Sequence, residues 1–341
     1  MNRRLPAEWE PQDGVLLAWP HADSDWRDNL AAVVPVFVRI AAAVSRFERL
    51  VIAAPEIGPV RELLQAAGID MGRVALFPVA TNDTWARDFG PITVLAQQGP
   101  VLLDFGFNAW GLKFAADLDN QVTGHLARLG AFGECARHIP GLILEGGSIE
   151  SDGDGTLLTT ASCLLSPNRN PHLDRRGIEA ALAALLGASR LLWLENGFLA
   201  GDDTDAHIDT LARFCSETTI AYVRCDDPAD EHHAALAAME DELRAFRTRE
   251  GRPYNLVPLP WPEACYGADG HRLPATYANF LLINGAVLVP TYGVPQDEAA
   301  LAVIARIFPD REIVGVDCRP LIAQHGSLHC VTMQIPRGGL P

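Results

Sequence analysis

Near its C-terminal end the chain reads Gln324-His325-Gly326-Ser327-Leu328-His329-Cys330-Val331-Thr332-Met333-Gln334. The glycine and the serine predict a turn, and residues 331–335 predict a short strand. Cys330 therefore lies where a loop enters a strand, a position at which a side chain can be held rigidly over a cleft. A single cysteine is more often a small buried hydrophobic residue than a nucleophile, so partners are needed to distinguish Cys330 from the rest.

Three polar segments lie upstream of Cys330, and each follows the end of a predicted strand. In the first, Asp83 and Asp88 flank Trp85, and in the second Glu145 precedes two glycines. The third, residues 202–209, surrounds a histidine with aspartates. A thiol, an imidazole and several carboxylates, far apart in sequence, are the components of a nucleophilic cysteine site.

The histidine of the third segment is His207, and Asp209 follows it by two positions. If this segment is extended, residues two apart point to the same side, so both side chains face one ligand. Simpler interpretations exist for the carboxylates. Asp88 could do no more than pair with its neighbour Arg87 or cap a turn. The aspartates near 202 could do no more than cap the segment ahead of them.

Length and charge restrict the possible functions. A chain of 341 residues with 48% hydrophobic content can form two domains or one closed repetitive domain, and no linker marks a boundary. The net charge of −16 argues against a nucleic-acid partner, which requires a basic face. It fits a small cationic substrate that is drawn into an acidic cleft, although it also fits an ordinary acidic protein.

Cysteine usage indicates the compartment. The chain has seven cysteines, an odd number, scattered without C-x-x-C spacing. This suits a reducing environment better than a disulfide framework or a zinc ribbon. The N-terminal arginines have no apolar segment behind them, and no run approaches about eighteen apolar residues. We therefore expect a cytoplasmic protein with no membrane partner.

The apolar pattern predicts strand pairs that alternate with single helices. The predicted strands span 15–19, 50–54, 74–79, 92–96, 101–105, 142–145, 148–150, 156–160, 190–194, 211–214, 218–223, 312–316 and 331–335. The predicted helices span 25–44, 59–67, 120–129, 173–186, 230–249 and 296–308. Residues 108–111 predict a loop, and residues 280–289 one apolar segment. No repeat is visible at the level of residue identity, so the pattern alone does not give an architecture.

Together these segments resemble the agmatine deiminase family of the guanidino-group-modifying (pentein) superfamily. The match follows the family's order from Trp19-Pro20 to Pro336. It rests on Asn82-Asp83-Thr84-Trp85-Ala86-Arg87-Asp88-Phe89-Gly90-Pro91, Asn108-Ala109-Trp110-Gly111, Glu145-Gly146-Gly147, Asp202-Asp203-Thr204-Asp205-Ala206-His207-Ile208-Asp209 and His329-Cys330. The resemblance implies one catalytic domain over residues 1–341. It also implies an α/β fold, a five-bladed α/β propeller of ββαβ modules around a central active site.

The resemblance also implies an activity, the hydrolysis of agmatine to N-carbamoylputrescine and ammonia. It implies that Cys330 is the nucleophile, His207 the acid and base, and Glu145 the carboxylate that orients His207. The substrate-binding residues that it implies are Asp88, Asp209, Trp85, Asp83 and Trp110. No metal or organic cofactor is expected, and a homodimer is a possible assembly.

The chemistry of a guanidinium agrees with these roles. The group is planar, delocalised and hard to deprotonate, so its carbon is a poor electrophile. Two carboxylates, Asp88 and Asp209, can hold it bidentately while its carbon becomes tetrahedral. A thiolate at Cys330 then attacks, and an imidazole protonates the leaving ammonia and activates water.

One departure from the family leaves the substrate open. Many members carry Gly-Gly-Gly-Asn before Ile-His-Cys, whereas this chain has Gln324-His325-Gly326-Ser327 before Leu328-His329-Cys330. The turn that shapes the pocket mouth therefore differs, and arginine, peptidylarginine or an amidinotransferase substrate stays an alternative. Two other classes are a metal-dependent hydrolase built on the acidic segments and a non-enzymatic propeller protein that binds ribosomes. The sequence has no H-E-x-x-H motif and no calcium loop to support a metal-dependent hydrolase.

Overall fold

Strand β1 (Gln12–Ala18) joins the two ends of the chain in one sheet. It pairs antiparallel with the last strand, β18 (Thr332–Pro336), and parallel with β2 (Arg49–Ala54), which pairs parallel with β3 (Val74–Pro78). In this computed structural model, which describes residues 3–341, the final strand thus completes a sheet that the first strand begins. The predicted strand at 331–335 is confirmed, and Cys330 lies just ahead of it.

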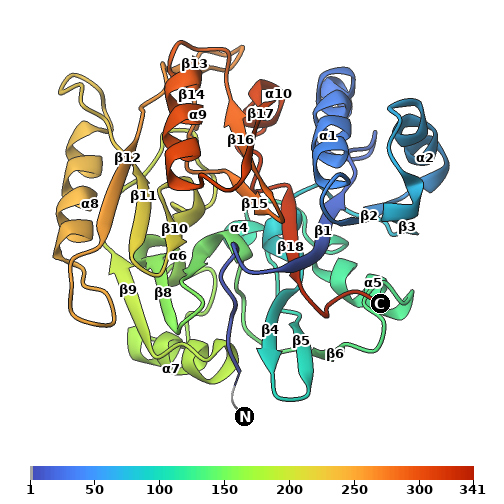
Figure 1. Ribbon diagram of the computed structural model, residues 1–341, viewed down its shortest axis with the longest axis horizontal. Coiled ribbons are helices and arrows are strands. Elements are labelled where there is room, and N and C mark those ends of the chain that lie inside the picture. Colours follow the sequence, from blue (N-terminus) through green and yellow to red (C-terminus); the bar gives the residue numbers. More distant parts are fainter. Residues whose placement is uncertain (1–2) are drawn as a thin grey trace.

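Four more sheets each have one antiparallel pair followed by one parallel pair, whereas the first sheet carries an additional parallel strand, β3. Their strands are β4 (Ile92–Ala96), β5 (Gly99–Leu103) and β6 (Ala136–His138); β7 (Ile149–Ser151), β8 (Thr156–Thr160) and β9 (Arg190–Leu194); β10 (Ala212–Ser216), β11 (Thr219–Val223) and β12 (Asn255–Leu259); and β15 (Leu281–Ile283), β16 (Ala286–Thr291) and β17 (Glu312–Asp317). A short hairpin, β13 (Cys265–Tyr266) with β14 (Arg272–Leu273), stands apart. Figure 1 shows the five larger sheets following one another around the middle of the view.

Helices form the crossovers that parallel strands require. The longer ones are α1 (Leu30–Val44), α2 (Ile57–Ala66), α5 (Val122–Arg128), α7 (Arg175–Leu186), α8 (His233–Ala245) and α9 (Gln296–Ile307). Figure 1 places them toward the periphery, with the sheets inside. Helix α7 shows why they dock there, because Ile178, Leu182 and Leu186 recur every four residues and are all buried.

The short helical segments lie mostly in the loops between these strands. They are α3 (Ala86–Phe89), α4 (Ala109–Leu112), α6 (Ala161–Leu164), α10 (Arg319–Ile322), and the 3-10 turns η1 (Arg27–Asn29), η2 (Met71–Arg73), η3 (Asp119–Gln121), η4 (Gly146–Ser148) and η5 (Ile208–Thr210). Residues 108–111, predicted as a loop, include α4, in which Trp110 has a positive φ of 55°. The longer predicted helices are all present. Helix α8 is shorter than the predicted helix at 230–249.

One predicted strand is wrong, and one apolar segment of unassigned type proves to be two strands. Residues 142–145 form only an isolated parallel bridge, between Ile143 and Gly106, and the N–H and carbonyl of Ile143 bond instead to the side-chain amide of Asn170, at 3.1 and 2.8 Å. A neighbouring strand would otherwise supply those bonds. Residues 280–289 hold two strands, β15 and β16, joined at Asn284-Gly285, where Gly285 has a positive φ of 75°.

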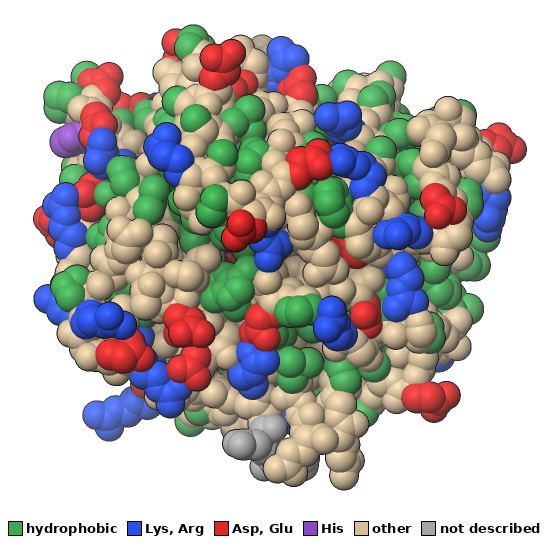
Figure 2. Space-filling view, in the orientation of Figure 1, with side chains coloured by type: hydrophobic (Ala, Val, Ile, Leu, Met, Phe, Trp, Pro, Cys, Tyr) green, Lys and Arg blue, Asp and Glu red, His purple; other side chains and the backbone are tan. Residues whose placement is uncertain are grey.

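Surface charge and the length and apolar character of the helices concern two kinds of partner that the sequence analysis considered, nucleic acid and membrane. Figure 2 shows acidic and basic side chains interspersed over one face, so on this face the net negative charge does not form a single acidic field. Among residues 3–341, no helix is both long and apolar enough to cross a bilayer.

Candidate active site

A cavity of about 460 Å³ opens beside Cys330. Its lining holds aromatic rings and carboxylates, and none of its lining residues in the described chain is a lysine or an arginine. The six aspartates that line it are Asp23, Asp25, Asp83, Asp88, Asp119 and Asp203. Such a lining favours a cation, because like-signed charges in a concave site focus their field into it.

Cys330 lies at this cavity in the turn that leads into β18. Asn279 fixes the turn: its side-chain oxygen accepts from the Cys330 N–H at 3.3 Å, and the thiol lies 3.4 Å from the same oxygen. Burial, followed by the charges of Asp209 and Asp88, raises the pKa of the Cys330 thiol well above its usual value. In the empty site the sulfur is therefore a thiol.

Asp88 is held by two donors from different segments. The indole N–H of Trp110 donates to one carboxylate oxygen at 2.9 Å, and the N–H of Gly147 donates to the other at 3.0 Å. Burial and the nearby Asp209 raise the pKa of Asp88 well above its usual range. Asp88 is thus fixed in place, and a cation nearby would favour its ionised form.

His207, Asp88 and Asp209 converge on Gly147. A Cβ built on this glycine would lie 2.6 Å from Nδ1 of His207, 2.9 Å from Oδ1 of Asp88 and 3.1 Å from Oδ2 of Asp209. The glycine is thus required for the close approach of all three groups. Residues 207–209 are not extended, because His207 precedes the 3-10 turn η5, so the predicted same-side alternation does not explain how they meet.

Three polar atoms at this point lack hydrogen-bond partners within residues 3–341. Both ring nitrogens of His207 and Oδ1 of Asp209 are buried without a hydrogen bond. Nδ1 of His207 is 3.6 Å from Oδ1 of Asp88, which is longer than a hydrogen bond. Burial lowers the pKa of His207 to about 3, so the imidazole is neutral. A buried acceptor without a donor is costly, and a ligand with several N–H groups would satisfy these atoms.

Glu145 has a partner that the sequence analysis missed. Both of its carboxylate oxygens accept from Nε of Arg169, at 2.9 and 3.0 Å. The same guanidinium binds Asp205 at 2.6 Å and the carbonyl of Thr204 at 2.8 Å, in the loop that leads to His207. Glu145 therefore acts on the position of this loop through Arg169. A fully buried carboxylate needs a cation, and that requirement is the signal that points to Arg169.

The remaining predicted residues, Trp85, Trp110 and Asp83, line the cavity with Cys330 and Asp88, whereas His207, Asp209 and Glu145 are not among its lining residues. Trp85 and Trp110 meet edge to face at 6.2 Å between ring centroids. Burial, and then Asp25, raises the pKa of Asp83 to about 7. The divergent turn belongs to the cavity as well, because Gln324, His325 and Gly326 line it. A Cβ on Gly326 would lie 2.1 Å from the Trp85 ring, so this glycine lets the turn pass under the indole.

Two groups of possible metal ligands occur within residues 3–341. They are Glu145, Cys163 and His207, and Glu8, Glu150 and His329. In the first, Arg169 already binds the carboxylate; in the second, Arg213 binds both carboxylates. The positive charge that a metal ion would bring is thus supplied by buried guanidinium groups, and the donor sets fit a metal poorly.

Comparison with known proteins agrees with this geometry. A model of the Porphyromonas-type peptidyl-arginine deiminase family matches residues 4–336. The chain belongs to this family. Within it, the chain is 35% identical to the agmatine deiminase of Pseudomonas syringae pv. syringae, with 97% of this chain and 95% of that protein covered.

Several solved structures are also similar to this chain. A cysteine-to-serine variant of the agmatine deiminase of C. jejuni, with substrate bound, has a TM-score of 0.91 and 39% identity, covering 99% of this chain and 97% of that one. A Porphyromonas gingivalis protein, provisionally named an arginine deiminase, reaches 0.94 and 53%, covering 99% and 100%. Dimethylarginine dimethylaminohydrolase shares only the fold, at 0.52 and 14%, covering 95% and 100%. The mixed α/β fold therefore has its neighbours in the pentein superfamily.

Proposed function

We propose that this protein is an agmatine deiminase, a hydrolase that converts agmatine and water to N-carbamoylputrescine and ammonia. One observation carries the proposal. Asp88, which lines the acidic cavity with Cys330, meets His207 and Asp209 at Gly147, and these two residues present buried polar atoms that have no partner within residues 3–341. A guanidinium supplies both the charge and the N–H donors that these atoms lack. The Pseudomonas relative described above carries the same activity in its name.

Binding is the first step. The guanidinium N–H groups donate to Asp209 and Asp88, which fix its plane next to the sulfur of Cys330. Trp85 and Trp110 cover its faces, and Asp83 contributes negative charge nearer the mouth. The substrate's amine then lies toward the acidic outer part of the cavity. Every contact comes from a side chain that is already held by its neighbours, so little reorganisation accompanies binding.

The covalent steps balance through Cys330 and His207. The thiol gives its proton to the neutral imidazole, and the thiolate forms an S–C bond to the guanidinium carbon. The C–N bond breaks as His207 returns the proton to the leaving nitrogen, which departs as ammonia and leaves an amidino-thioether. Water then loses a proton to His207 and attacks the same carbon. The C–S bond breaks, the sulfur takes the proton from His207, the hydroxyl proton of the product passes to solvent, and N-carbamoylputrescine is released.

The architecture that we propose is a five-bladed α/β propeller formed by one catalytic domain over residues 1–341. What supports it is that five sheets share one strand order and that β18 pairs with β1. The site residues come from loops that follow different sheets, as a central site between blades requires. A cytoplasmic location and a homodimer stay predictions. The first is based on seven cysteines that are all free in the described residues.

Agmatine should exceed free arginine in kcat/KM by at least about 10²-fold, because the lining offers no arginine or lysine to a substrate carboxylate. The measurement is ammonia release from agmatine, arginine and an arginine-containing peptide under identical conditions. The resemblance to peptidyl-arginine and arginine deiminases makes this comparison decisive. Equal rates, or a preference for arginine, would assign the protein to a related activity.

Replacing Gly147 by alanine should lower kcat/KM for agmatine by about 10²-fold. The new methyl group would lie within 3.1 Å of His207, Asp88 and Asp209, so it would displace all three. A misplacement of about 1 Å in an active site can cost that factor. The matched control is Gly58→Ala, because a Cβ at Gly58 meets nothing within 4 Å. Unchanged activity in Gly147→Ala would show that the three groups do not act together.

A further inference from the structure

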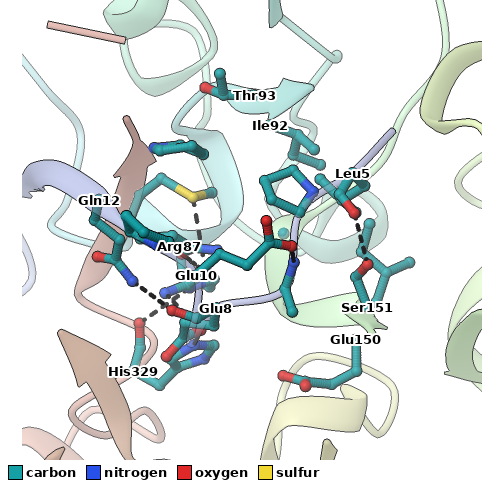
Figure 3. Close-up of a pocket in the computed structure, with 18 residues that line it drawn as sticks. Leu5, Glu8, Glu10, Gln12, Arg87, Ile92, Thr93, Glu150, Ser151 and His329 are labelled. Carbon is teal, nitrogen blue, oxygen red and sulfur yellow. Dashed lines mark hydrogen bonds and ion pairs between the residues drawn. The ribbon is translucent and has the colours of Figure 1, made fainter. Parts of the chain in front are cut away.

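Glu8 reaches the centre of the molecule from the segment that precedes β1. It is buried beside a small cavity of about 50 Å³, which lies at a different place from the large one at Cys330 (Figure 3). One oxygen accepts from the backbone N–H of Leu282 at 2.7 Å. The other lies 2.7 Å from Nε2 of His329 and 3.0 Å from Nη2 of Arg213. An N-terminal residue is thus tied to the residue next to the nucleophile.

His329 connects this segment to the candidate active site. Its Nδ1 lies 2.7 Å from Oδ2 of Asp209, and its Nε2 lies at the same distance from Glu8. His329 is 1% exposed, and its backbone N–H donates to the Asn279 side chain at 2.8 Å. The ring is therefore fixed between two carboxylates that lie about 200 residues apart in the sequence.

These distances restrict the hydrogen bonds that the ring of His329 can make. A neutral imidazole has one N–H, so it can donate to only one of the two carboxylates, whereas an imidazolium donates to both. Arg213 lies 3.1 Å from Nε2, but it has its own acceptors in Glu8 and Glu150, and the shorter contact is the one to Glu8. Two carboxylates at 2.7 Å thus favour an imidazolium.

We propose that Glu8 acts through His329 as a positioning residue, keeping Asp209 ionised and aimed at the substrate guanidinium. This inference rests on the proposed function, because it assigns Glu8 and His329 to the binding of that group. Only Oδ2 of Asp209 is used by His329, and Oδ1 is left without a partner for the substrate. Glu8 itself touches no substrate.

The balance of charge around Asp209 supports this role. Burial acts to raise the pKa of Asp209, but the hydrogen bond and the charge of His329 outweigh it, and the pKa is lowered. The charged and titratable groups that face Asp209 or its partner are Asp88, His207, Cys330, His329, Arg213, Arg87, Glu8 and Glu150. Several of these are acidic, so loss of the imidazolium would favour the protonated form of Asp209, which grips a guanidinium poorly.

The test uses Glu8→Gln, which removes the charge and keeps the size. Without that charge the His329 ring holds Asp209 less well in its ionised form, so the acid limb of kcat/KM for agmatine should move up by about 1 pH unit. Agmatine binding, measured calorimetrically in a Cys330→Ser background near neutral pH, should weaken by roughly tenfold while kcat changes less. The matched control is Glu10→Gln, two residues away, which loses a bond to Arg4 at the surface and should leave the pH profile unchanged.

A conservative variant separates charge from shape. Glu8→Asp keeps the charge, so it should restore the acid limb toward the wild-type position even if the protein is less stable. Equal profiles for Glu8→Asp and Glu8→Gln would overturn the proposal. If neither variant folds, nitrogen NMR of histidine-labelled wild-type protein decides, since the proposal requires one buried histidine with protons on both ring nitrogens. A wild-type protein that releases no ammonia from agmatine would contradict the proposed function. The NMR result would still test the link from Glu8 through His329 to Asp209.

Discussion

Cys330→Ser should lose turnover of agmatine by about 10³-fold or more, with the protein still folded. A serine hydroxyl is much harder to ionise than a thiol, so His207, whose pKa is lowered to about 3, is too weak a base to take its proton in these acidic surroundings. Loss of a nucleophile that acts together with its base removes most of the catalytic rate. The measurement is steady-state ammonia release, together with agmatine binding by calorimetry, which should persist.

The control for this experiment follows from the structure. Cys163 is unsuitable, because its sulfur lies within 4.8 Å of ligand atoms of Glu145 and His207, so its replacement would disturb the same site. Cys135→Ser is the matched variant, since this half-buried thiol only donates to the carbonyl of Gly338 at 3.3 Å and a hydroxyl can do the same. Normal turnover by Cys330→Ser would contradict the mechanism.

The sequence predicts local structure where one short-range rule decides it. The buried run of β1 and the spacing of apolar residues in α7 each give their element directly. The predicted strand at 142–145 is wrong because the backbone of Ile143 bonds to the side chain of Asn170. The local sequence pattern does not show this partner. The repeated sheet order is likewise invisible in residue identities, since it is a property of pairing between distant strands.

The candidate site divides in the same way. Motifs identify the groups that carry chemistry, such as Cys330 and His207, because these residue types have few alternatives. The groups that hold them in place are harder to find, because arginines and glutamates are common and their role depends on burial. Arg169 and Glu8 are examples, since both bury charges whose partners lie more than twenty residues away. A buried charge needs a partner of opposite sign, and only the fold shows which charges are buried.

Binding of a guanidinium should lower the pKa of the Cys330 thiol by up to about three units. In the empty site, burial, Asp209 and Asp88 raise that pKa, and the neutral His207 provides no compensating charge. A guanidinium at roughly 4 Å from the sulfur contributes about 4 kcal/mol at an effective dielectric constant near 20, before solvent relaxation reduces it. The substrate therefore helps to create the thiolate that attacks it.

Ultraviolet absorbance of the thiolate tests this, as the difference between wild type and Cys330→Ser titrated with and without a guanidinium compound that does not react. The expected result is a clearly lower pKa of Cys330 with the ligand bound. A diamine of the same length as agmatine, without the guanidinium, is the control, and it should shift the pKa less because its charge cannot lie in the plane held by Asp88 and Asp209. A free-enzyme pKa already below about 7 and unmoved by the ligand would show that the protein alone prepares the thiolate, as in sites where a cationic histidine lowers a cysteine pKa. The distinction has a kinetic consequence: a thiolate formed only with substrate leaves the free enzyme slow to react with alkylating reagents, since the thiolate and not the thiol is the nucleophile.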